Sequence, residues 1–203
     1  MLGSIKYNLT HLLDFRGRDA RQTFWYYVLF LAILYVIGWV IALAPLIGSA
    51  VQGAMKAAQA GVPQDQIGAR MMQGMGPGMT SIAWFGLIAN LAFTLLILAA
   101  FVRRLHDSGN PGWWAGAVLA IRLATVGFGI AAIGKIDAAV QQVTAAMGDP
   151  AKLQQIQAQS MHQSAGQTLL GLAGWIAFIV VLVFGVFGST DGPNRYGEAP
   201  VVF

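Results

Sequence analysis

The hydrophobic residues of the chain are concentrated in four long runs, and the segments between them hold all but one of the charged residues. The runs cover residues 23–46, 82–102, 112–133 and 168–187, and each has at least 20 residues. A helix of about 20 apolar residues is long enough to cross the hydrocarbon core of a bilayer. The pattern predicts an all-α integral membrane protein with four transmembrane helices. The first run exceeds the roughly 7–15 residues of a signal-peptide core, so it is not expected to be cleaved.

The composition agrees with a chain that is largely surrounded by lipid. Of the 203 residues, 57% are hydrophobic and 10% are charged, whereas globular domains carry about 25% charged residues. The mean hydropathy is +0.63, which argues against a large water-soluble enzyme. Cysteine is absent from the sequence, which excludes disulfides, thiolate nucleophiles and cysteine-ligated zinc.

Lysine and arginine are distributed unevenly between the segments that flank the runs. Seven lie in segments 1–22, 103–111 and 188–203, whereas four lie in segments 47–81 and 134–167. Because cytoplasmic loops retain an excess of positive charge, the first three segments are predicted to be cytoplasmic and the other two to face outward. We expect a multi-pass protein of a bacterial inner (plasma) membrane with both termini cytoplasmic. Topology accounts for most of the formal charge of +4, and no basic stripe predicts nucleic-acid binding.

The cytoplasmic N-terminal segment carries apolar residues at helical spacing. Leu2, Ile5, Leu9 and Leu12 recur every three or four residues. This spacing predicts a short amphipathic helix over residues 2–14 that lies on the inner leaflet. Membrane lipids are therefore expected partners.

The outer segments are rich in alanine, glutamine and methionine, a composition typical of helices. Residues 49–60 and 64–75 are predicted to form one helical hairpin, with breaks at residues 61–63 and 76–78, where glycine and proline are concentrated. In the second outer segment, apolar residues at 133, 136, 140, 143 and 147 follow a coiled-coil spacing. This spacing predicts that the third transmembrane helix continues outward.

The second outer segment also contains a clear helix boundary. Gly148 is expected to end one helix, Asp149 to cap the next, and Pro150 to occupy the first position of that helix. Residues 151–164 then return toward the membrane. The sequence therefore predicts two helical hairpins on the outer face, packed on each other.

Three cytoplasmic segments contain an unusual density of glycine, arginine and aspartate. They read F-R-G-R at 15–18 with R-Q-T-F-W at 21–25, R-R-L-H-D-S-G-N-P-G-W-W at 103–114, and G-S-T-D-G-P-N-R-Y-G at 188–197. On these motifs the chain resembles a bacterial inner-membrane family known as domain of unknown function eight hundred and five. The resemblance covers nearly the whole chain and implies a multi-span plasma-membrane protein, with no assigned activity and no catalytic residues. The long Gln-, Ala- and Met-rich outer segments depart from the family's pattern, so a function located there need not be the family's.

The cytoplasmic ends of the four predicted helices meet on one face, which brings these motifs together as a candidate ligand-binding site. Its members are Arg16, Arg18, Arg21, Arg103, Arg104, His106, Asp107, Asp191, Asn194 and Arg195. One interpretation is structural, because bidentate pairs between arginine and carboxylate can join the helix ends. In the other, an anionic lipid headgroup or a phosphorylated ligand binds here, because six arginines outnumber the five carboxylates of this face and arginine is suited to phosphate.

The sequence contains no convincing catalytic constellation. His106, Asp107 and Ser108 are the residue types of a hydrolase triad, but consecutive side chains diverge, whereas a triad is assembled in space. A general base at His106, assisted by Asp107 or Asp191, remains an alternative. No metal-binding histidine motif or phosphate-binding loop is recognisable. We expect a protein that is not an enzyme and that has no cofactor.

Arg122 is the single charge within the four runs. It is predicted to lie about 15 Å from the start of the third run, because a helix rises 1.5 Å per residue. An arginine at this depth is expected to face protein or water. Asn90 is predicted at the matching depth of the second run, so a hydrogen bond between the two is one interpretation. The alternatives are a charge that attracts an anion and an arginine that extends to the membrane surface.

The methionines are also distributed unevenly. Apart from Met1, all of them lie in the outer segments. Met71, Met75 and Met79 are spaced by four, and His162 lies in the other outer segment. Thioethers and imidazole favour Cu(I), although flexible methionine also packs well between helices and the predicted break at 76–78 would turn Met79 away.

We therefore expect a non-enzymatic scaffold or a component that binds anionic lipid or ligand, as a homo-oligomer or with a membrane-protein partner. A small transporter or channel for an anionic solute is the main alternative, and a copper-binding protein is the third.

Overall fold

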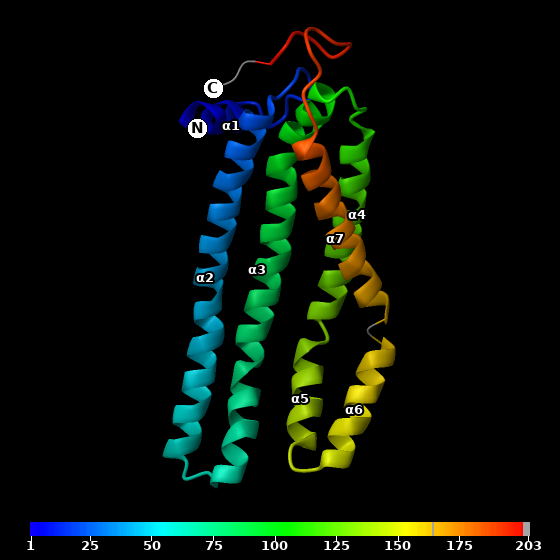
Figure 1. Cartoon of the computed structure of the whole chain (residues 1–203). Helices are drawn as coiled ribbons and strands as arrows, with labels where there is room; N and C mark the ends of the chain where they lie inside the picture. Colours follow the sequence, from blue (N-terminus) through cyan, green and yellow to red (C-terminus); the bar gives the residue numbers. More distant parts are fainter. Residues whose placement is uncertain (164, 201–203) are drawn as a thin grey trace. The chain divides into compact units, whose positions relative to one another are not determined.

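The computed structural model describes the backbone of residues 1–163 and 165–200, and their side chains except those of 65, 161–163, 165–167 and 170. The described residues form seven helices (Figure 1) and no extended strand, so the prediction of an all-α protein is confirmed. The helices are α1 (Leu2–Thr10), α2 (Arg21–Gln59), α3 (Gln64–Asp107), α4 (Trp113–Ile133), α5 (Ile136–Ala146), α6 (Pro150–Gln163) and α7 (Ala165–Val186).

Within the described residues, three helices are long and apolar enough to cross a membrane, namely α2, α3 and α4. The fourth predicted run forms α7, whose described apolar stretch Gly171–Val186 is shorter than the about 20 residues of a typical span. With 39 and 44 residues, α2 and α3 have lengths of about 58 Å and 66 Å at 1.5 Å per residue. Each therefore extends well beyond a hydrocarbon core of about 30 Å.

The chain divides into two compact units, which are described separately. The first unit contains Met1–Ile37, Ala89–Thr125 and Leu170–Phe203, and the second contains Gly38–Ile88 and Val126–Leu169. The first unit has an aromatic and aliphatic core contributed by α2, α3, α4 and α7. Its α7 lies directly against α2, because Trp25 Nε1 donates to the carbonyl of Gly185 at 3.0 Å. A Cβ atom at Gly185 would be 2.9 Å from the Phe24 ring, so only glycine allows this approach.

In the second unit, α2 and α3 cross at small residues. A Cβ atom at Gly74 would lie 3.1 Å from the Cα of Gly53, and one at Gly78 would lie 2.7 Å from the Cα of Leu46. Small residues four positions apart allow helix backbones to approach closely, as in the small-xxx-small motif of membrane helices. The predicted break at 76–78 is therefore wrong, because α3 continues through Pro77 and contacts α2 closely on both sides of it, at Gly74 and Gly78. The sequence signal of the crossing, G-x-x-x-G at 74–78, was missed.

The other half of the second unit contains two differences from the predictions and one agreement. The helix after the third run does not continue, because α4 ends at Ile133 and α5 begins at Ile136 after a turn that contains Gly134. Val140 is buried while Met147 is exposed, so the predicted apolar seam is only partly buried. The cap at Asp149 is confirmed, because its Oδ1 accepts hydrogen bonds from the amides of Ala151 and Lys152 at 3.1 and 3.2 Å.

Candidate functional site

The three motifs rich in glycine, arginine and aspartate come together in the first unit, where backbone hydrogen bonds align them. The amide of Asp19 donates to the carbonyl of Arg103 at 3.2 Å, and the amide of Thr190 donates to the carbonyl of Asp107 at 2.9 Å. These bonds hold the segment before α2 and the segment after α7 against the last turns of α3. Gly17 and Gly109 have φ angles of +82° and +74°, so the turns beside this contact require glycine.

Asp107 is the centre of the site, because its carboxylate is shared by two arginines from different segments. Arg18 donates to Oδ1 through Nε at 3.1 Å, and its Nη2 forms an ion pair with the same oxygen at 3.0 Å. Arg104 donates to Oδ2 through Nη1, and Ser189 Oγ donates to the same oxygen at 2.5 Å. All three charged side chains are at most 1% exposed. The carboxylate is therefore fully engaged.

The remaining donors of Arg18 and Arg104 bind main-chain carbonyls rather than further carboxylates. Arg18 donates to the carbonyls of Gly192 at 2.6 Å and Thr190 at 2.7 Å. Arg104 donates to the carbonyl of Phe187 and, at 3.3 Å, to that of Gly185. The carbonyls of Gly185 and Phe187 lie at the C-terminal end of α7, where the partial negative charge of the helix stabilises a cation. Those of Thr190 and Gly192 belong to the tail that follows.

Arg103 forms a second buried centre with the N-terminal segment. It donates through Nε to Asp19 at 3.0 Å, through Nη2 to Asn8 Oδ1 at 2.6 Å, and through Nη1 to the carbonyls of His11 and Asp14. Its guanidinium also lies 5.4 Å from the centre of the Tyr7 ring. Burial raises the pKa of Asp19 above its usual value, against the opposing effect of Arg103.

The arginine–aspartate network, defined as Arg18, Asp19, Arg103, Arg104 and Asp107, has one more cation than carboxylates. The surplus positive charge is met by Asn8 and by main-chain carbonyls of the segment between α1 and α2, of the end of α7 and of the tail. Each arginine is at most 6% exposed, and each has its donors directed at partners within the chain. Counting only charged side chains in the sequence overlooked Asn8, Ser189 and Thr190.

The other predicted site residues form a separate, more exposed group. Arg16, Arg21 and Asp191 are exposed, as is Arg195. Arg195 lies over the Tyr196 ring at 4.6 Å and donates to the carbonyl of Gly109 at 3.2 Å. The ring of Tyr196 stacks on His106 with centroids 3.9 Å apart.

Asn194 connects this exposed group to α3, because its amide donates to the carbonyl of His106 at 2.9 Å.

The side chains of the apparent hydrolase triad at 106–108 diverge. His106 stacks on Tyr196, Asp107 binds arginine, and Ser108 Oγ donates to the carbonyl of Leu105 at 3.1 Å. These three side chains therefore do not form the hydrogen-bonded chain of a hydrolase triad.

The predicted hydrogen bond between Arg122 and Asn90 is wrong. Oδ1 of Asn90 is the atom that would accept it, and among the described residues this buried oxygen has no hydrogen-bond partner. Arg122 instead approaches α7, with Nη1 3.7 Å from the position that a Cβ atom at Gly174 would occupy. Matching depth along two helices does not place two side chains on facing sides, which explains the error.

The structure describes the methionines of the predicted copper site but not the histidine side chain. Met71, Met75 and Met79 lie on the continuous helix α3, so the expected break does not separate Met79 from the other two. The side chain of His162 lies outside the described residues. Among the described residues, no group of three or more His, Cys, Asp or Glu side chains is placed to hold a metal ion.

Comparison with known proteins supplies a family. The model of the family described as "Protein of unknown function (DUF805)" matches residues 12–198, which include every residue of the arginine–aspartate network. The chain belongs to the DUF805 family. No curated protein and no solved structure matches this DUF805 member. The family description and the apolar helices together make it a membrane protein of unknown function.

Proposed function

We propose that this DUF805 member is a non-enzymatic, four-span scaffold of a bacterial inner membrane, with a cytoplasmic face that binds anionic lipid. The observation that carries the proposal is the division of its cytoplasmic cations into two groups. Arg18, Arg103 and Arg104 are buried and bonded within the chain, whereas Lys6, Arg16 and Arg21 are exposed. The buried group serves the fold, and the exposed group is available to phosphate headgroups.

The arrangement of helix ends supports four spans with both termini on the cytoplasmic side. The network joins residues before α2, at the end of α3 and after α7, and α4 begins a few residues after α3 ends. A chain that crosses four times would bring these ends to one side. The buried Ala177 of α7 belongs to the same core as α2, α3 and α4, as expected if α7 crosses with them. The long outer parts of α2 and α3, with α5 and α6, would then form helical hairpins outside.

The surface of α1 supports contact with lipid. One face of α1, at Ser4, Ile5 and Asn8, is buried, so the predicted apolar stripe is divided and Ile5 belongs to the protein interior. Leu2 and Leu9 remain 80% and 42% exposed and share a face with Lys6 by their helical spacing. An apolar face with a cation is typical of helices that lie at an anionic membrane surface.

Native mass spectrometry of the purified protein in neutral detergent tests lipid binding. The protein should retain added phosphatidylglycerol in preference to phosphatidylcholine. The double variant Arg16→Gln/Arg21→Gln should lose this preference and keep its unfolding temperature. The control Lys135→Gln/Lys152→Gln makes the same change in net charge on exposed side chains of the second unit, and should keep the preference. Equal binding of both lipids by the parent would contradict the proposal.

Transport of an anionic solute is a second candidate, favoured by Arg122. Its guanidinium faces α7 at Gly174, and no Asp or Glu occurs in any of the four runs. A cation without a carboxylate within the membrane is a feature of anion pathways. Chloride or phosphate flux through proteoliposomes should then be abolished in Arg122→Leu and partly retained in Arg122→Lys. Parent flux equal to that of empty liposomes would exclude transport of these anions.

A further inference from the structure

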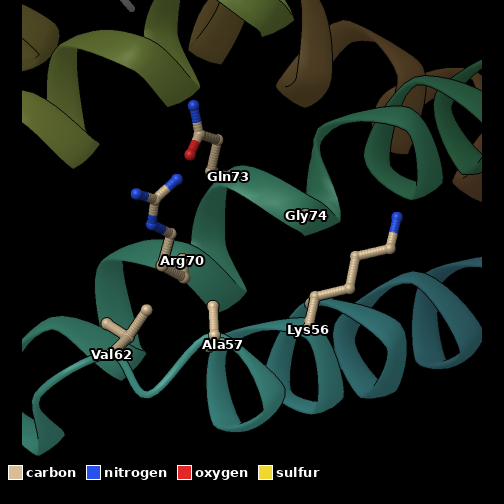
Figure 2. Close-up of a pocket in the computed structure, with 8 residues that line it drawn as sticks. Lys56, Ala57, Val62, Arg70, Gln73 and Gly74 are labelled. Atoms are coloured by element: carbon tan, nitrogen blue, oxygen red, sulfur yellow. The ribbon is translucent and has the colours of Figure 1, made fainter.

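The second unit contains a pocket between α2 and α3, close to the turn that joins them (Figure 2). Its volume is about 360 Å³, within the range of pockets that hold small organic molecules, about 300–1,000 Å³. Both helices contribute to its lining. The close crossing at Gly53 and Gly74 fixes the two helices at this point, because bulkier residues would separate them.

The polar side chains of the pocket are two cations and one amide. Figure 2 shows Arg70 and Gln73 projecting from α3 on the same side, while the Lys56 side chain rises from α2 on the other side of Gly74. Lys56 and Arg70 are exposed. Among the described residues, neither forms an ion pair, and the lining contains no carboxylate. Among its described lining residues, the pocket therefore presents two positive charges and no negative one.

The rest of the lining is apolar and small. Ala57, Ala60 and Val62 contribute methyl groups from the end of α2 and the following turn. Ala57 is 3% exposed, so it forms the floor of the pocket. A surface of this kind binds hydrocarbon or an aromatic ring, while the guanidinium and the amide bind oxygen atoms.

We propose that this pocket binds a small organic anion whose phosphate or carboxylate group contacts Arg70 and Gln73. Lys56 adds positive potential from the opposite side, and the apolar part of the ligand lies on Ala57 and Ala60. With the predicted span of α2 ending at residue 46, Lys56 lies about 15 Å farther along the helix. This is beyond the headgroup layer of about 5–8 Å on each side, so the ligand is a water-soluble anion rather than a lipid. The site is independent of the cytoplasmic lipid surface proposed above.

Calorimetric titration of the purified protein in neutral detergent with phenyl phosphate tests the site. Phenyl phosphate should bind more tightly than inorganic phosphate, because only the former reaches the apolar floor. Arg70→Gln should weaken binding of phenyl phosphate by about tenfold or more, the effect of losing roughly 1.4 kcal/mol. The matched control Lys135→Gln removes an exposed cation that does not line the pocket, and it should change affinity by less than about twofold.

A second variant tests the pocket without altering charge. Ala60→Leu should weaken phenyl phosphate and leave inorganic phosphate unchanged, with an unfolding temperature equal to that of the parent. Equal losses in Arg70→Gln and Lys135→Gln would overturn the proposal, since attraction would then depend on net charge alone. No binding of phenyl phosphate by the parent would also overturn it. Displacement of phenyl phosphate by short-chain phosphatidylglycerol would refute the choice of a soluble ligand over a lipid.

Discussion

The arginines of the network in the first unit and the cations of the pocket in the second unit have opposite environments, although a guanidinium occurs in both. In the first unit, three arginines are buried and surround two aspartates, Asn8 and main-chain carbonyls. In the second unit, Lys56 and Arg70 are exposed beside a pocket. A buried guanidinium must be satisfied within the protein, because the cost of removing it from water is large. A cluster of arginines in sequence therefore predicts a ligand site only where their donors remain free.

The largest effect should come from Asp107, because its removal leaves two buried arginines without a carboxylate. Asp107→Asn should lower the free energy of unfolding by about 3–5 kcal/mol, measured by thermal unfolding in detergent. The control Asp191→Asn removes an exposed carboxylate of the same face and should change stability by less than about 0.5 kcal/mol. If the two variants had similar free energies of unfolding, burial of the network would not determine how much it stabilises the protein.

The two arginines of this face that differ in burial should respond differently to truncation. Arg104→Ala removes charge-assisted hydrogen bonds to Asp107 and to the end of α7, and should cost about 2–3 kcal/mol. Arg195→Ala loses an exposed contact with the Tyr196 ring, so the cost should be below about 1 kcal/mol. Equal costs, measured by the same unfolding assay, would contradict the division into a buried network and an exposed group.

The glycines of α3 provide the corresponding test in the second unit. A Cβ atom at Gly78 would collide with the backbone of Leu46, whereas one at Gly68 would have nothing within 4 Å. Gly78→Ala should therefore cost about 1–3 kcal/mol, while Gly68→Ala should stabilise the helix by about 0.5–1 kcal/mol. If both variants are more stable than the parent, α2 and α3 do not cross as closely as described.

Features set by neighbouring residues can be predicted from the sequence better than features set by which side of a helix faces another helix. Asp149 was identifiable as a cap because glycine precedes it and proline follows it, and the apolar runs identified the long helices. The turn at 76–78 was predicted wrongly, since packing at Gly74 and Gly78 overrides the helix-breaking tendency of Pro77. The carbonyl partners of Arg103 and Arg104 could not be predicted, because every residue has a carbonyl and only the folded path selects among them.

The smallest effect is expected for the interaction between Arg122 and Asn90, which is one interpretation of the sequence and which the structure lacks. Arg122→Leu and Asn90→Leu each remove a polar group from an apolar environment, so neither should destabilise the protein. The decisive quantity is the coupling energy from a double-mutant cycle. It should lie within the error of additivity, about 0.3–0.5 kcal/mol. A direct hydrogen bond between membrane helices contributes about 0.6 kcal/mol on average and up to about 1.7.

The same cycle on Arg104 and Asp107, which pair in the buried network, supplies the positive control and should give more than about 1 kcal/mol. A coupling above about 1 kcal/mol between Arg122 and Asn90 would mean that the two side chains meet after all. Arg122 would then belong with the paired cations of the network, and its case as an anion-attracting charge would be lost. A coupling near zero leaves Arg122 facing α7 at Gly174 with its charge uncompensated by Asn90, which is the condition that the transport candidate requires.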